Sequence, residues 1–129
     1  MRRILATLAT LVVVVGMTTA ATFPAKTWTS KPFMGAKANT GTVTATADMG
    51  KITLRVSDDF VIPDTPAPSW QIVDSKGNTY LLNQFRIKGD KTNREITLPG
   101  YIKDVAKVQV WCSFAEALLG ETSFDTIVK

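Results

Sequence analysis

Cys112 is the only cysteine among the 129 residues, and the chain contains no histidine. Without an imidazole, Ser-His-Asp and Cys-His catalysis are excluded, and so are histidine-ligated zinc, haem and copper sites. One cysteine cannot form an internal disulfide, a CxxC redox pair or a thiolate metal cluster. The residue types therefore leave one reactive group to consider, a single thiol.

The pattern around Cys112 favours burial, because cysteine is among the most buried residue types. Alternation along the predicted strand from Val105 to Phe114 gives it apolar neighbours on one face: Ala106, Val108, Val110 and Phe114. No lysine or arginine lies within four residues of Cys112 to stabilise a thiolate. A lone thiol in an oxidising compartment is nevertheless a liability unless it is buried or used, so both interpretations stay open.

Carboxylates and tryptophans are the other candidates for chemistry. Asp58, Asp59 and Asp64 are residue types that bind calcium, but turn chemistry explains them. The separate segment Asp74–Asn78 does not match a calcium loop either, because Lys76 stands where an oxygen ligand is needed. We therefore predict no metal site.

Three tryptophans could form an aromatic platform for a ligand, or they could lie in the core. Trp28 lies before the first predicted strand, Trp70 begins one, and Trp111 falls on the strand face opposite Cys112. Trp70 and Trp111 are the candidate binding residues.

The first 21 residues have the pattern of a secretory signal peptide. Arg2 and Arg3 precede the apolar run Leu11–Val15, and small residues follow up to Ala20 and Ala21, where cleavage fits. The apolar run is short for a membrane span, although an uncleaved anchor is the alternative. We expect a secreted or periplasmic domain of residues 22–129 that has no membrane contact after cleavage.

Removing Arg2 and Arg3 reduces the net charge from +4 to +2, with 13 basic and 11 acidic residues left. No basic block or stripe remains, so neither a nucleic acid nor an anionic membrane is predicted as a partner.

The remaining chain alternates between short β-branched or apolar runs and turn residues, which is typical of an all-β fold. The predicted strands are Thr42–Ala47, Lys51–Ser57, Trp70–Val73, Thr79–Leu82, Arg94–Leu98, Val105–Phe114 and Thr122–Val128. Phe85–Lys88 either continues a strand or forms a neighbouring one. Ala115–Leu119 has helical propensity, and Gly120 interrupts it. We predict a single antiparallel β-sandwich, jelly-roll-like in type.

Val110-Trp111-Cys112-Ser113-Phe114, followed by Leu119-Gly120-Glu121, resembles the signature of the electron-transfer DM-thirteen domain family. That family has a WC-x-x-F-like strand and then a glycine; here the phenylalanine comes one residue sooner. Leu54–Phe60, Pro66–Val73 and Ile96–Pro99 resemble its upstream segments in matching order, so the resemblance covers about 33–124.

The resemblance implies an extracytoplasmic β-sandwich in which Cys112 does redox work, as a bare thiol or by holding a haem, with an unknown redox protein as partner. The missing histidine disfavours haem, which would need Cys112 alone or with Met34 or Met49 as a second ligand. The alternative is a non-catalytic sandwich that binds a ligand or protein, with Cys112 structural. No cofactor is identified.

Overall fold

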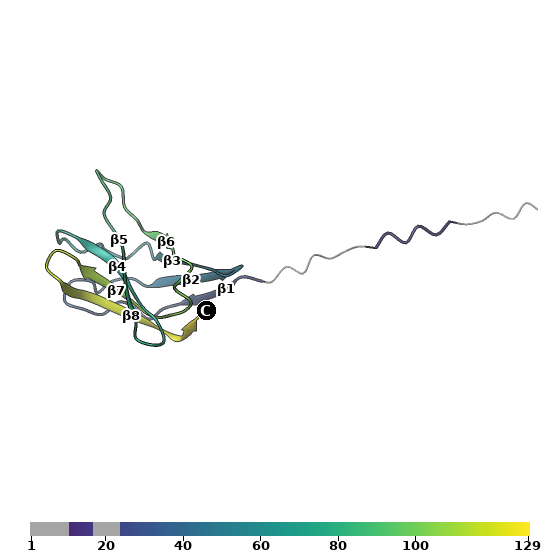
Figure 1. The fold of residues 1–129 in the computed structure, drawn as a ribbon. Helices are drawn as coiled ribbons and strands as arrows, with labels where there is room; N and C mark the ends of the chain where they lie inside the picture. The colour runs from purple at the N-terminus through teal and green to yellow at the C-terminus, as the bar shows by residue number, and fades with distance from the viewer. Residues whose placement is uncertain (1–10, 17–23) are drawn as a thin grey trace, which may run out of the picture.

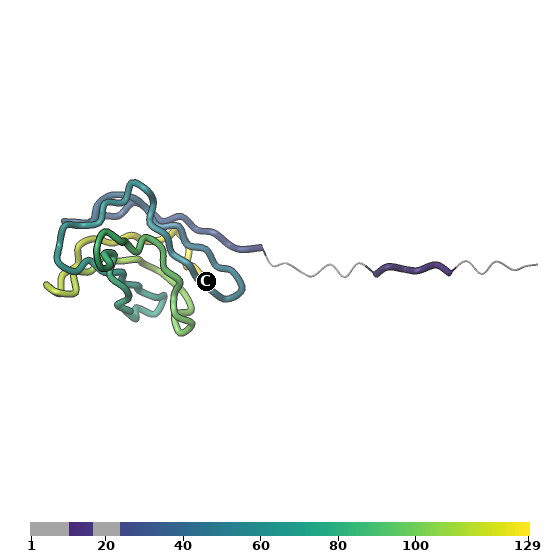
Figure 2. Tube along the Cα trace, turned by 90° about the horizontal axis from the view of Figure 1, so that it is seen from above, coloured from purple at the N-terminus to yellow at the C-terminus, as the bar shows by residue number. Residues whose placement is uncertain are grey.

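The computed structural model describes residues 11–16 and 24–129 and confirms the all-β prediction. Within these ranges, two four-stranded antiparallel sheets pack face to face as a β-sandwich (Figures 1 and 2). The first sheet has the order β1-β2-β3-β6 and the second the order β5-β4-β7-β8. The strands are β1 (Lys26–Thr29), β2 (Val43–Asp48), β3 (Lys51–Val56), β4 (Pro68–Val73), β5 (Thr79–Gln84), β6 (Glu95–Thr97), β7 (Val105–Cys112) and β8 (Ala117–Val128).

Two of the predicted hairpins are present. β2 and β3 pair through the turn at Met49 and Gly50, both of which have positive φ, and the alternating apolar residues of β3 point into the core. β4 and β5 pair through the turn that Asp74 organises: its carboxylate accepts hydrogen bonds from the Lys76 and Asn78 amides at 3.0 and 2.8 Å. Short polar side chains that satisfy turn amides in this way explain why the turn was predictable.

Four aromatic rings line the core between the sheets. Phe33 and Phe60 lie 5.0 Å apart between ring centroids, Phe60 and Phe85 lie 5.3 Å apart, and Trp70 stacks on Phe85 at 4.6 Å. Phe85 comes directly after β5 rather than in a strand, so the prediction of a strand over Phe85–Lys88 is wrong beyond the isolated bridge from Arg86 to Thr92. β1 was also not expected, because the first predicted strand begins at Thr42.

The β7–β8 hairpin corrects two predictions. Val108, Val110 and Cys112 face the core as expected, but Phe114 is 79 % exposed because β7 ends at Cys112 and the chain turns. Ala115–Leu119 is not helical, since β8 begins at Ala117, opposite Cys112. Cross-strand pairing along the whole hairpin outweighs a short helical propensity.

The free edge of β8 is covered by residues 31–38, which connect β1 to β2. The Met34 and Glu121 amides and carbonyls exchange two hydrogen bonds of 2.9 Å, and the Ala38 amide donates to the Leu119 carbonyl at 2.9 Å. A Cβ on Gly120 would overlap with the carbonyl oxygen of Ala38. The close approach of residues 31–38 to β8 therefore requires glycine at position 120. The sequence predicted only that Gly120 interrupts a short helical segment.

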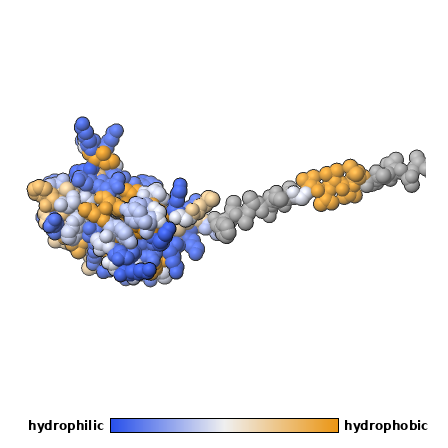
Figure 3. All heavy atoms as spheres, viewed as in Figure 1, coloured by the Kyte–Doolittle hydropathy of each residue, from blue (hydrophilic) through white to orange (hydrophobic). Residues whose placement is uncertain are grey.

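Most of the predicted signal peptide lies outside the described residues. Its described part, 11–16, has no regular secondary structure, and its apolar side chains are exposed (Figure 3). No helix among the described residues has the length and apolarity to span a membrane.

Replacing Gly120 with alanine is expected to lower the free energy of unfolding by about 1–3 kcal/mol, because the new methyl group must displace the Ala38 backbone. Urea unfolding measures the change. Gly100→Ala is the control: nothing lies near its Cβ position, so the change should stay within about 0.5 kcal/mol. Equal stability of the two variants would contradict the crossing.

Candidate functional site

Cys112 is the last residue of β7, where it pairs with Pro68 of β4 and Ala117 of β8. The residue is only 1 % exposed and its thiol is free. The structure thus places the thiol inside the protein, on the core face that the alternation predicted. It lies at the end of the sheet, so two loops rather than a further strand cover its sulfur.

Polar groups surround the sulfur. The Ala115 amide donates a hydrogen bond to Sγ at 3.4 Å. This bond lowers the pKa of the Cys112 thiol below its ordinary value of 9.0; burial acts in the opposite direction, and the backbones of Ala67 and Phe114 and the Thr65 hydroxyl add to the lowering. Donors of this kind favour the thiolate, which is the nucleophilic form of cysteine.

The Thr65 hydroxyl oxygen is buried and has no regular hydrogen-bond partner among the described residues. It contributes to lowering the pKa of Cys112, as the smallest of the groups that do so. The hydroxyl can donate a hydrogen bond, and a thiolate accepts such a bond more strongly than a neutral thiol does.

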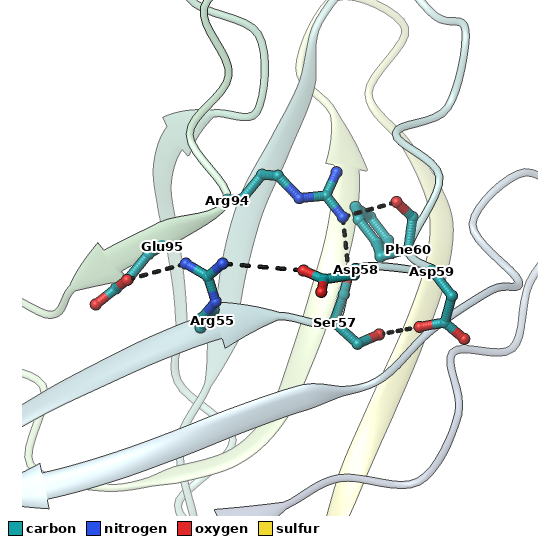
Figure 4. Close-up of polar contacts among 7 residues, drawn as sticks. All are labelled: Arg55, Ser57, Asp58, Asp59, Phe60, Arg94 and Glu95. Carbon is teal, nitrogen blue, oxygen red and sulfur yellow. Dashed lines mark hydrogen bonds and ion pairs between the residues drawn. The ribbon is translucent and has the colours of Figure 1, made fainter.

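One cover of the sulfur is the loop 57–67, which leads from the first sheet to the second and is held by two arginines. The guanidinium of Arg94 donates to the Ser57 and Phe60 carbonyls at 2.7 and 2.9 Å (Figure 4). The guanidinium of Arg86 donates to the Ile62 and Thr65 carbonyls, each at 3.2 Å. Bonds from a charged donor are stronger than neutral ones, so this cover is firmly fixed.

The other cover is the turn Ser113–Glu116, which is held through Ser113: its hydroxyl donates to the Ala67 carbonyl at 3.4 Å and lies 3.4 Å from the Ser69 hydroxyl. The Ser113 amide donates to the Ala67 carbonyl at 3.1 Å, and Glu116 adopts a φ of 51°, a left-handed conformation that disfavours residues other than glycine. Glu116 therefore holds backbone strain in the turn that lies beside Sγ.

The three tryptophans have different positions. Trp70 is 0 % exposed and its indole N–H donates to the Asn93 carbonyl at 2.8 Å. Stacking on Phe85 places the whole ring in the core, which is the other position that the sequence left open for it. Trp28 packs partly against the core. Trp111 is half-buried on the outer face of the second sheet, opposite Ser69 and Leu118.

A row of polar side chains crosses the outer face beside Trp111, and the sequence did not predict it. The Gln71 amide donates to Gln109 at 2.8 Å, and the Gln109 amide donates to the Glu121 carboxylate at 2.9 Å. The three residues are direct cross-strand neighbours in β4, β7 and β8. Strand register could have revealed the row, but the sequence does not say which strands are adjacent.

The acidic residues serve the loop rather than a metal. Ser57 donates to the Asp59 carboxylate, and Asp58 lies 3.9 Å from Arg55, which also contacts Glu95 at 3.3 Å (Figure 4). The described residues contain no group of three or more carboxylate or thiolate side chains arranged to hold a metal ion.

A haem does not fit the residues present. The Cys112 sulfur is covered, whereas Met34 and Met49 point to solvent with 76 % and 93 % exposure. Met49 also lies in the β2–β3 turn, at the end of β3 away from the loop that leads to Cys112. The Cys112 thiol and the methionine thioethers therefore do not face a common cavity that could hold a haem.

Comparisons with protein-family models, curated proteins and solved structures found no match for this chain.

The lowered pKa of Cys112 predicts how stability depends on pH. In the folded state the thiol loses its proton at lower pH than in the unfolded state, so the stabilisation is fully present above about pH 9 and is lost as the pH falls through the folded-state pKa. We expect the stability difference between the wild type and Cys112→Ser to grow in favour of the wild type between pH 7 and about pH 9.5. Urea unfolding at each pH measures it; a constant difference would contradict the lowered pKa.

Proposed function

We propose that the chain is an exported electron-transfer domain of the DM-thirteen type, with Cys112 as its redox centre. The observation that supports this role best is the Ala115 amide directed at Sγ, in a setting whose donors lower the pKa of the thiol. A cysteine that only fills a core needs no such donors. The signature of Trp111, Cys112 and Gly120 supplies the family resemblance.

The proposed step is a thiol–disulfide exchange with an extracytoplasmic protein disulfide. The Cys112 thiolate attacks one sulfur of that disulfide; a bond forms between the two sulfurs, the partner's S–S bond breaks, and the second partner sulfur leaves as a thiolate that takes a proton. Because the chain has no second cysteine, a dithiol of another molecule must then release Cys112. Its first thiolate attacks the Cys112 sulfur and releases the remaining partner sulfur as a thiolate; its second thiolate then attacks the first donor sulfur, closes the donor's own disulfide and releases the Cys112 thiolate. Two electrons thus pass from the dithiol to the original disulfide.

Access to the sulfur sets a structural condition on this step. A disulfide must approach Sγ closely, and the closed structure leaves Cys112 only 1 % exposed. The turn Ser113–Glu116 would have to open, since Arg86 and Arg94 fix the loop on the other side. Phe114, which is exposed on this turn, is the first side chain that a partner would meet.

Export supplies the setting for such chemistry. Residues 1–21 would act as a cleaved signal peptide and deliver the domain 22–129 to a secreted or periplasmic location. Disulfides form and persist in these compartments, so a thiol–disulfide partner would be present there.

The second candidate is a non-catalytic binding module in which Cys112 is structural. The burial of Cys112 favours it, and Trp111 with the neighbouring Gln71–Gln109–Glu121 row offers an outer sheet face with an aromatic ring and polar groups. Trp111→Ala would abolish ligand binding in this case and leave the reactivity of the thiol unchanged.

The redox proposal predicts that iodoacetamide labels Cys112 in the native protein within minutes. Glu116→Gly, which relieves the positive φ of the closed turn, should slow this labelling, because the relaxed turn opens less often. Mass spectrometry measures the labelled fraction over time.

Met49→Gly relieves a similar positive φ in the β2–β3 turn, away from Cys112, and serves as the matched control for that variant, while Cys112→Ser gives the unlabelled baseline. If the wild type is labelled only in denaturant, Cys112 is a core residue and the redox proposal fails.

A further inference from the structure

A groove lies at the end of the sandwich opposite Cys112. Cys112 ends β7, whereas Lys103 lies two residues before the start of β7 and Lys129 follows the last residue of β8. These two lysines and Lys26 of β1 border a groove of about 660 Å³. Its volume is in the range of small-molecule sites. The C-terminus lies beside β1 at this end of the molecule (Figure 1).

The floor of the groove is apolar. Ile52 of β3 and Ile102 of the β6–β7 connection line it, and both belong to the core between the sheets, with Ala47 packed against them. An apolar chain placed here would extend the core of the sandwich. It would remove its own surface and that of the floor from water, which is the main source of affinity for apolar ligands.

The rim is positively charged and uncompensated by acidic side chains. None of the groove residues is acidic, and none of its three lysines forms an ion pair among the described residues. Asp104 is next to Lys103 in sequence, but its carboxylate accepts hydrogen bonds from the Ser75 amide and hydroxyl at 2.7 and 2.6 Å. An α-carboxylate at Lys129 would offset the charge of that lysine, and Lys26 and Lys103 would still leave the rim positive.

We propose that this groove binds a single-chain amphipathic anion, a carboxylate on a linear alkyl chain of the fatty-acid type. The chain would lie on Ile52 and Ile102, and the carboxylate would pair with Lys26 and Lys103. Charge complementarity selects the anionic head group, and the apolar floor selects the chain. The site is independent of Cys112 and of the redox role proposed above.

The test uses the full chain expressed in its host and purified as processed there, with monomeric dodecanoate as the probe. Calorimetry gives the affinity, and NMR shifts of Ile52 and Ile102 locate the site. We expect saturable binding that weakens as salt is added. Acetate, which lacks the chain, and dodecyl maltoside, which lacks the charge, should each bind at least about tenfold more weakly.

The double variant Lys26→Gln/Lys103→Gln should raise the Kd for dodecanoate about tenfold, whereas the matched pair Lys76→Gln/Lys91→Gln, exposed and outside the groove, should leave it unchanged. Equal affinities of the two double variants, NMR shifts away from the floor, or equal binding of the maltoside would overturn the proposal. Two further results would overturn it: binding to anionic phospholipid vesicles with no binding of dodecanoate, and a dimer in solution whose interface covers the groove.

Discussion

The position of Cys112 depends on one close backbone contact, the crossing of residues 31–38 over β8. At Gly120 the two backbones approach so closely that a side chain cannot fit between them. The crossing pairs with β8 along its free edge, and Gly120 in turn pairs with Val110 of β7, two residues before the cysteine. A covered edge also removes a site of intermolecular strand pairing. The crossing thus holds the strand pair that carries the thiol.

The thiol combines two properties that usually exclude each other. It is buried, as an inert core cysteine would be, yet amide groups and a hydroxyl around it lower its pKa. The two covers of the sulfur explain how both hold at once. Arg86 and Arg94 fix the loop on one side by bonds to carbonyl groups, and the turn with the strained Glu116 closes the other side. Reactivity would then depend on how often the turn opens.

The sequence predicted the parts of the fold that local patterns determine. Alternation identified most strands and the buried face of β7, and Asp74 with Gly77 identified a turn. The end of β7 was missed because it depends on the pairing of Cys112 with Ala117, which alternation does not encode. The sequence left open whether Trp70 is buried, because its stacking partner, Phe85, comes from a loop.

The surroundings of the site were less predictable than the site residue itself. Cys112 was identified because it is the only cysteine, but the groups that lower its pKa come from two separate segments, the loop with Thr65 and Ala67 and the turn with Ala115. The arginines that fix the loop contact carbonyls more than twenty residues away in sequence. Such long-range contacts follow from strand order, and strand order is a property of the whole fold.

The most direct test of the account is the titration of Cys112 followed by the ultraviolet absorbance of its thiolate. The chain has one cysteine, so the difference between the wild type and Cys112→Ser reports that group alone. The account predicts a midpoint below the ordinary value of 9.0 in the folded protein and a return to about that value in denaturant. A folded-state midpoint at or above 9.0 would show that the donors around Sγ do not stabilise a thiolate, and it would contradict the redox role.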